Sequence, residues 1–322
     1  MFEEFDNSYP QKPDLIEKRR GSNASKYILI VALMLLLFNN IDPSNYWVVL
    51  SMVGVVGIHE LGHFIAMKYF GYNEPNFIFH TLISKDGTEI EQPISQKSKI
   101  LTLQMGPVPG VIAGSVLFYY ALGMQSDMIL ILSLMLIGIN LFSLLPLDPL
   151  DGGKIIKNLF FPKAQRPYLI FVLISSLAII VIGYFTEFYM LIALGFLMGF
   201  KVRNIQKNML IYDELESQEI DYFKPYKKLT DREYWKIRNV FLEFNPRLKS
   251  IIPSTSEIWE NENLLSAQIR QLLKSEIKLD AGPILKLFTF ILYLACLLIP
   301  LYLVQINFDF VREILSKIDF NV

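Results

Sequence analysis

Apolar runs near the length of a membrane helix recur along this chain and constrain its fold more than any other feature. A helix needs about 20 residues to cross a bilayer core, because every backbone polar group in lipid must be satisfied within the segment. Seven runs can be recognised; the first is short, and the sixth is also compatible with a half-span. They comprise residues 27–38, 47–70, 100–122, 128–147, 168–185, 188–200 and 283–304.

Lysine and arginine are distributed unevenly between these runs, which indicates how the chain is threaded. With seven crossings, the connections on one side, at residues 39–45, 123–127 and 186–187, contain neither residue type. The N-terminal segment and the polar stretch 201–280 fall on the other side, which is rich in both. Loops rich in lysine and arginine stay in the cytoplasm. We therefore expect a multi-pass integral membrane protein (inner or plasma membrane, if bacterial) with a cytoplasmic N-terminus.

Composition supports a membrane protein and excludes several other classes. Of the 322 residues, 52% are hydrophobic, which is more than is usual in a soluble domain. A net charge of −1 and the lack of a basic stripe exclude nucleic acid as an expected partner. The single cysteine, Cys296, excludes an internal disulfide, and its apolar surroundings favour a buried thiol. The polar, mixed-charge N-terminus is unlike a cleavable signal peptide.

These patterns predict an all-α polytopic membrane protein with six to seven transmembrane helices. Residues 1–26 are expected to form a cytoplasmic segment, and residues 27–200 the transmembrane core. Residues 201–282 are charged, and we expect a small helical cytoplasmic domain there. Residues 283–322 are expected to hold the last transmembrane helix and its tail.

A small β-hairpin is predicted at residues 76–98, after the second span. Apolar and polar residues alternate there around Asp86-Gly87, a dipeptide typical of tight hairpin turns. The hairpin is either a solvated surface element or an edge that pairs with an extended peptide. His80, which lies within it, is expected to be a surface residue.

Two helix starts are predicted in the cytoplasmic domain. Thr230 with Glu233, and Ser254 with Glu257, have the spacing of capping boxes. The second helix is expected to bury one apolar stripe against a neighbour. This stripe consists of Ile258, Leu265, Ile269 and Leu272.

The second apolar run contains the sequence His-Glu-Leu-Gly-His. Residues i and i+4 lie on one face of a helix, so His59 and His63 can bind one metal ion while Glu60 stands beside a water on that ion. Ionisable residues inside a span are costly and mark a functional site. The segment therefore predicts a metal site within the membrane.

A catalytic zinc usually has three protein ligands and one open position, so a third ligand is required. The best candidates lie where the fourth run gives way to a turn rich in proline and glycine. Asp148 and Asp151 are the acidic residues of that turn. Irregular backbone at membrane depth is tolerated where it lines a cavity or is buried in protein.

These residues carry a resemblance to a known family. The HExxH sequence in a span, followed about two spans later by a proline-containing segment that ends in Leu-Asp-Gly-Gly, resembles the site-2 protease family of intramembrane zinc metalloproteases. Gly106-Pro107 in the intervening span is similar to that family's Gly-Pro motif. The resemblance covers residues 47–154 and implies that His59, His63 and Asp151 bind Zn²⁺.

The resemblance also implies roles for polar residues near the metal. Glu60 matches the catalytic glutamate, which accepts a proton from the attacking water and returns it to the leaving amine. Where the family has asparagine eight residues before the ligand aspartate, this chain has Ser143, and Asn140 lies one helical turn earlier. Asn140 or Ser143 could donate a hydrogen bond to the oxyanion or hold the substrate extended, so both are candidate catalytic residues.

The implied function is that of a zinc metalloendopeptidase that cuts a transmembrane protein near the cytoplasmic face. The substrate would be a membrane-tethered transcription regulator or an anti-sigma-type inhibitor. An inactive relative that binds membrane proteins without cutting them is one alternative, because Ser143 replaces the family's asparagine. A metal transporter is another, but it would show further ligands and two related halves, and the sequence shows neither.

Overall fold

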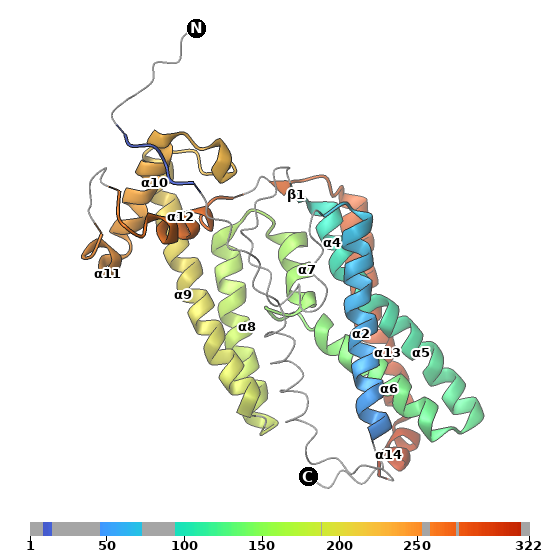
Figure 1. Cartoon of the computed structure of the whole chain (residues 1–322). Coiled ribbons are helices and arrows are strands. Elements are labelled where there is room, and N and C mark those ends of the chain that lie inside the picture. Colours follow the sequence, from blue (N-terminus) through green and yellow to red (C-terminus); the bar gives the residue numbers. More distant parts are fainter. Residues whose placement is uncertain are drawn as a thin grey trace. The chain divides into compact units, whose positions relative to one another are not determined.

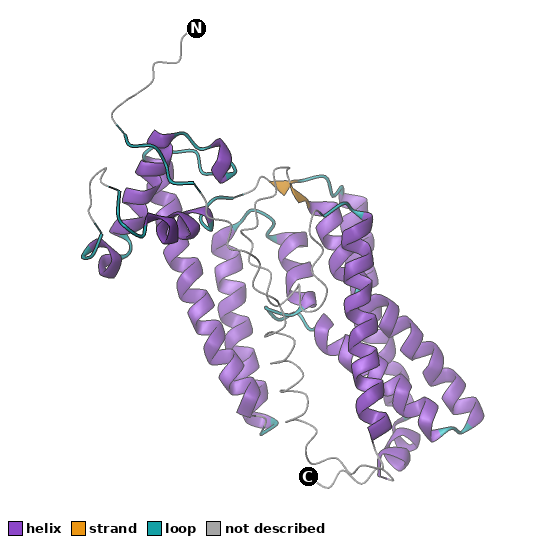
Figure 2. Cartoon of the chain, viewed as in Figure 1, coloured by secondary structure: helices purple, strands orange, loops and turns teal. Residues whose placement is uncertain are grey.

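The computed structural model describes residues 9–14, 46–72, 94–187, 189–252, 258–274 and 277–316 (Figure 1). These residues are mainly helical, and their strands are limited to one short parallel pair (Figure 2). The elements are α2 (Tyr46–Tyr69), β1 (Ile94–Ser95), α4 (Gln96–Met105), α5 (Pro107–Met124), α6 (Asp127–Leu144), α7 (Asp151–Phe160), α8 (Gln165–Phe185), α9 (Tyr189–Ser217), η2 (Tyr226–Lys228), α10 (Asp231–Glu243), α11 (Pro246–Lys249), α12 (Glu262–Arg270), β2 (Ile277–Lys278), α13 (Pro283–Ile306) and α14 (Phe308–Ser316).

The chain forms two compact units. The α2–α7 unit also contains α13 and α14, and all three candidate metal ligands lie within it. The α8–α12 unit contains the described N-terminal residues and the β1–β2 pair. The first unit comprises the described parts of residues 20–84, 96–162 and 279–322, and the second those of residues 1–19, 85–95 and 163–278.

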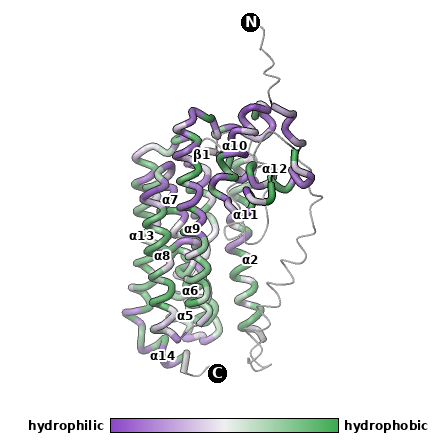
Figure 3. The backbone as a smooth tube through the Cα atoms, turned by 90° about the vertical axis from the view of Figure 1, so that its left-hand side faces the viewer, coloured by the Kyte–Doolittle hydropathy of each residue, from purple (hydrophilic) through white to green (hydrophobic). Residues whose placement is uncertain are grey.

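Five helices of the described residues are long and apolar enough to cross a membrane. Large apolar side chains on their outer faces are more than half exposed, for example Ile65, Leu177 and Ile291. Such surfaces are unfavourable in water but suited to lipid, and α5, α6, α8 and α13 are largely hydrophobic in Figure 3. The structure thus agrees with a helical membrane protein, while the expected span 27–38 lies outside the described residues. The five are Trp47–Tyr69, Gln96–Met124, Asp127–Leu144, Gln165–Phe185 and Pro283–Ile306.

Proline and glycine determine several helix boundaries. The predicted run 128–147 stops being helical after Leu144, because the residue before Pro146 is disfavoured in the helical region. The third predicted span is interrupted at Gly106, since Pro107 has no backbone N–H to continue the helical ladder. The short run 188–200 is the beginning of a longer helix, α9, which continues to Ser217.

In the α2–α7 unit, α13 fixes the loop that follows α6. The Tyr293 hydroxyl donates a hydrogen bond to the carbonyl of Leu144, with a distance of 2.8 Å. The Gln104 amide on α4 donates to the carbonyl of Thr289, at 3.1 Å. The loop between α6 and α7 is therefore anchored where it leads to Asp151. The surrounding apolar cluster includes Ile100, Leu103, Val111, Leu144, Ile155, Leu159 and Cys296, so the cysteine is buried as predicted.

In the α8–α12 unit, α8 and α9 pack closely and α9 then enters a small helical domain. The Ser176 hydroxyl donates to the carbonyl of Gly195, at 2.7 Å, so the two backbones approach where glycine has no side chain. Side chains from the second half of α9 join a core with α10 and α12. This core contains Ile211, Leu215, Tyr226, Tyr234, Trp235, Ile237, Val240, Leu265, Ile269 and Leu272.

One of the two predicted helix starts of this domain is confirmed. Thr230 and Glu233 form a reciprocal capping box at the start of α10. The other pair, Ser254 and Glu257, lies outside the described residues. α12 begins only at Glu262, and Ile258 is therefore exposed, unlike the other three residues of the predicted stripe, which are buried.

The predicted hairpin at residues 76–98 lies mostly outside the described residues. Its last residues form β1 and the first turn of α4. β1 pairs in parallel with β2, with Ile94 opposite Ile277 and Ser95 opposite Lys278.

The N-terminal residues 9–14 lie against the helical domain. Trp235 on α10 donates its indole N–H to the carbonyl of Pro10, at 2.6 Å. The backbone N–H of Lys12 donates to the Asp231 carboxylate, at 2.8 Å. Because the two parts touch, residues 9–14 and the helical domain lie on the same side of any membrane that the apolar helices cross.

A buried ion pair links α10 to α12. The Arg238 guanidinium donates to both carboxylate oxygens of Glu262, at 2.7 and 3.1 Å, and the Tyr234 hydroxyl donates to one of them, at 2.8 Å. Both charged side chains are almost completely buried. Burial and the nearby Glu262 carboxylate raise the pKa of the Tyr234 hydroxyl, which stays a donor at all physiological pH values.

Replacement of Glu262 by leucine is expected to destabilise the helical domain, because it leaves the Arg238 charge buried without its partner. Loss of one member of a buried pair costs about 3–5 kcal/mol. Thermal unfolding of the detergent-solubilised chain measures the effect. Glu260→Leu, at an exposed neighbouring position, is the matched control, and an equal loss in both variants would contradict this account.

Candidate metal centre

The two histidines project from α2 into the interior of the α2–α7 unit. His59 and His63 are both buried, and their rings meet edge to face with centroids 4.8 Å apart. Gly62 between them lets α2 approach the end of α4, since a Cβ there would overlap the carbonyl of Met105. The glycine of the HExxH sequence thus allows the histidine-bearing turn to reach the break at Gly106.

Asp151 is the first residue of α7, where a helix N-terminus favours an ionised carboxylate. The two glycines that follow it are required because there is no room for a side chain at either position. A Cβ on Gly152 would overlap the carbonyl of Leu144, and one on Gly153 the carbonyl of Leu147. The Asp-Gly-Gly sequence therefore lets α7 begin directly against the loop that leaves α6, with the carboxylate directed inward.

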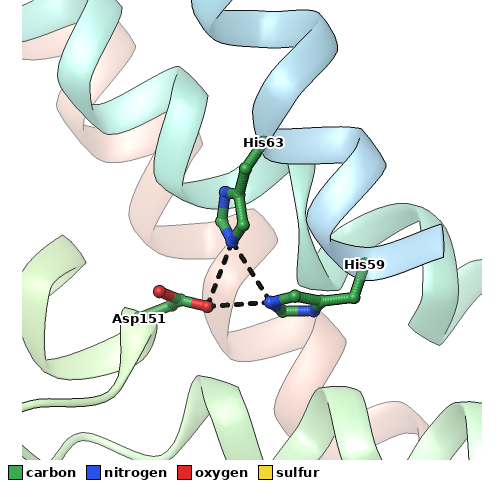
Figure 4. A group of neighbouring side chains, drawn as sticks. All are labelled: His59, His63 and Asp151. Atoms are coloured by element: carbon green, nitrogen blue, oxygen red, sulfur yellow. Dashed lines mark hydrogen bonds and ion pairs between the residues drawn. The ribbon is translucent and has the colours of Figure 1, made fainter. Parts of the chain in front are cut away.

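The three side chains converge, as Figure 4 shows. The Nε2 atoms of His59 and His63 are 3.1 Å apart, and each lies 3.2–3.3 Å from Oδ2 of Asp151. Ligands about 2.0–2.1 Å from a tetrahedral zinc are separated by roughly 3.3 Å. The three atoms therefore fit one face of a zinc coordination tetrahedron, and the fourth corner is available to water.

Hydrogen bonds on the far side of each ring set the histidine tautomers. Nδ1 of His63 lies 2.8 Å from the carbonyl oxygen of Thr102, which can only accept, so this nitrogen carries the proton. Nδ1 of His59 lies 2.8 Å from Oδ1 of Asn140. The Asn140 amide nitrogen donates to the carbonyl of Leu136, at 2.8 Å, which directs Oδ1 toward His59 as an acceptor. Both Nε2 atoms of the neutral rings therefore present lone pairs.

Three acceptor atoms therefore meet at the centre: Nε2 of His59, Nε2 of His63 and Oδ2 of Asp151. None of them carries a hydrogen that could form a hydrogen bond to the others. Oδ1 of Asp151 is also buried without a hydrogen-bond partner among the described residues. Unpaired buried acceptors this close together are unfavourable. A divalent cation would remove the conflict, and two neutral imidazoles with one carboxylate are a common ligand set for zinc.

Two glycines, one between α4 and α5 and one on α5, make room for this arrangement. A Cβ on Gly106 would overlap the imidazole of His63, and one on Gly110 would overlap the amide of Asn140. The Gly-Pro pair that interrupts the third span therefore has a steric role, in addition to ending α4.

The remaining sequence candidates take different positions. Glu60 is buried beside His59 on α2. Ser143 is partly buried, and its hydroxyl donates to the carbonyl of Asn140, at 3.0 Å. Asp148 is buried but does not belong to the ligand group, which in the described part of the chain consists of His59, His63 and Asp151. His80 lies outside the described residues.

One contributor to the site could not be predicted from the sequence. The carbonyl of Thr102 orients His63, and a main-chain acceptor leaves no signature in a residue pattern. Its only indirect signal is the nearby Gly106-Pro107, which marks the place where α4 ends.

Comparisons with known proteins leave the geometry as the basis for interpretation. No family model matches the chain, and no curated protein or solved structure matches it either. The ligand set, its burial and the surrounding apolar helices are therefore the structural observations that bear on function.

Asp151→Asn is expected to retain less than about a tenth of the bound zinc, because an amide oxygen is a far weaker zinc ligand than a carboxylate. Asp148→Asn, an isosteric change at a buried aspartate only three residues away, is expected to keep most of it. Zinc per chain, measured by atomic absorption after purification, distinguishes the two. The opposite order would show that the ligand has been assigned to the wrong aspartate.

Gly106→Ala is expected to weaken zinc binding on the order of tenfold, because the new methyl group displaces the His63 ring from its position. Gly123→Ala lies in the same span at a position where a Cβ meets nothing within 4 Å. Competition with a chromogenic chelator gives both affinities. Similar affinities for the two variants would exclude the steric role of Gly106.

Proposed function

We propose that this protein is an intramembrane zinc endopeptidase, which hydrolyses a peptide bond within or near the transmembrane segment of another membrane protein. The observation that carries the proposal is the buried group of His59, His63 and Asp151 within apolar helices, with Glu60 beside it. The resemblance of residues 47–154 to the site-2 protease family supports the same assignment.

The residues of the centre have distinct roles in this proposal. When bound, zinc supplies a Lewis acid that lowers the pKa of a water to about 7 and polarises the scissile carbonyl. Glu60 accepts the proton that the attacking water gives up and transfers it to the amine as the C–N bond breaks. The low dielectric of the buried site strengthens both interactions.

The contacts of Asn140 and Ser143 indicate that the two residues have different roles. Both polar groups of the Asn140 side chain are engaged, one with His59 and one with the carbonyl of Leu136. We assign Asn140 to holding His59 in the tautomer that binds metal. Ser143 has a hydroxyl that can rotate, so it is the better candidate for donating a hydrogen bond to the oxyanion.

The substrate we propose is a single-span protein cut near the cytoplasmic face, where release of a fragment can signal. A membrane-tethered transcription regulator or an anti-sigma-type inhibitor fits this description. The substrate helix must unwind locally, because helical carbonyls are already hydrogen-bonded. In the proposed topology the chain crosses seven times, with residues 27–38 and the first part of α9 as two of the crossings, and residues 201–282 are cytoplasmic.

Two alternatives make different predictions. A catalytically inactive relative would bind zinc and substrate without cutting, and Ser143 at the family's asparagine position favours it. A metal transporter would need further ligands along a path. The described residues contain one ligand group of the required kind, which favours hydrolysis.

Glu60→Gln tests the proposal, because it removes the proton acceptor and leaves the zinc ligands unchanged. We expect both proteins to bind zinc and the variant to cleave single-span substrates about 10²–10⁴-fold more slowly than wild type in detergent. Equal zinc with no cleavage by either protein, across a panel of substrates, would favour the inactive relative. Zinc flux into vesicles that persists in Glu60→Gln would favour the transporter.

A further inference from the structure

The N-terminal segment Tyr-Pro-Gln-Lys-Pro-Asp has a pattern that the metal centre does not explain. Pro10 and Pro13 are three residues apart, the spacing that places two residues on one side of a polyproline II helix, which has three residues per turn. In Figure 1 the segment, coloured blue, runs beside α10. It lies in the same compact unit as the helical domain.

Two aromatic side chains donate hydrogen bonds to the backbone of this segment. The indole N–H of Trp235 donates to the carbonyl of Pro10, at 2.6 Å, and the hydroxyl of Tyr226 donates to the carbonyl of Pro13, at 2.8 Å. Both aromatic residues are buried, and Tyr9 packs against the same core. Aromatic grooves that hydrogen-bond to the carbonyls of Pro-x-x-Pro peptides are a recurrent mode of polyproline recognition.

Lys12, which lies between the two prolines, makes further contacts of its own with the helical domain. Its ammonium group donates to the carbonyls of Tyr226 and Lys227, both at 3.1 Å, and to that of Leu229. The same group lies 5.5 Å from the centre of the Tyr226 ring, a cation–π contact. Its backbone N–H is bound by Asp231. A cation is thus selected at this position by carbonyls and an aromatic face.

We infer that Trp235, Tyr226, Asp231 and the carbonyls of residues 226–229, here called the proline groove, form a recognition site for Pro-x-Lys-Pro peptides. The chain's own residues 9–14 occupy it in cis. A lysine-containing proline-rich segment of a partner protein occupies it when the N-terminal segment leaves.

The contact between residues 9–14 and the proline groove is small, so a partner peptide can replace the resident segment. Six residues that are held by a few hydrogen bonds can detach without unfolding the domain, since short surface segments open at low free-energy cost. A tethered ligand acts at an effective concentration on the order of millimolar. A partner therefore binds well only when it is abundant or when the resident segment has been removed or altered.

A labelled peptide of residues 8–15 tests this inference on the detergent-solubilised chain. We expect saturable binding, by fluorescence anisotropy, to a variant lacking residues 1–14, and binding at least about tenfold weaker to the intact chain, whose groove is already filled. A peptide with Lys12→Glu and a peptide with Pro10→Ala and Pro13→Ala are the matched controls. Each is expected to bind the truncated chain at least about tenfold more weakly.

The inference is overturned if the truncated chain, with native helix content, binds no peptide. It is equally overturned if the control peptides bind as well as the natural one, or if the intact chain binds as well as the truncated chain. Should truncation prevent folding, full-length Lys12→Glu replaces it, because the resident segment is then weakened in place. That variant must bind the added natural peptide more tightly than wild type does, and introduction of Asp231→Asn into it must reduce this binding.

Discussion

A polar atom enclosed by apolar helices must find a partner, and this requirement governs the centre of the α2–α7 unit. His59, His63 and Asp151 are buried with their acceptor atoms 3.1–3.3 Å from one another. Outward hydrogen bonds to the Thr102 carbonyl and the Asn140 amide keep the inner nitrogens free of protons. A shared cation would resolve the resulting conflict, and the three side chains lie where they could hold one.

Close approach of backbones is what makes this geometry attainable. Gly62, Gly106 and Gly152 each lie where a methyl group would overlap a carbonyl or an imidazole. Helices in lipid gain little from burying apolar surface against one another, so small residues at their contacts matter more than in water. Glycine therefore occupies three of the close approaches around the centre: one on α2, one between α4 and α5, and one on α7.

The long apolar helices and the histidine pair were predictable, because apolar length and i, i+4 spacing are local properties of a helix. The choice of Asp151 over Asp148 was not local, and it followed from the family resemblance. The Thr102 contact and the exposure of Ile258 were beyond prediction, since the first depends on where α4 ends and the second on where α12 begins. Docking of residues 9–14 on α10 is a tertiary contact between segments more than 200 residues apart, which no local pattern encodes.

That docking contact also limits how the chain can be threaded. The two segments that it joins, residues 9–14 and the helical domain, face the same aqueous compartment. The polypeptide between them must therefore traverse the bilayer an even number of times. Four of the five apolar helices of the described residues lie between Pro13 and Tyr226. If all four traverse, any fifth passage in that interval has to be accompanied by a sixth, and a topology map with an odd count there is incompatible with the fold.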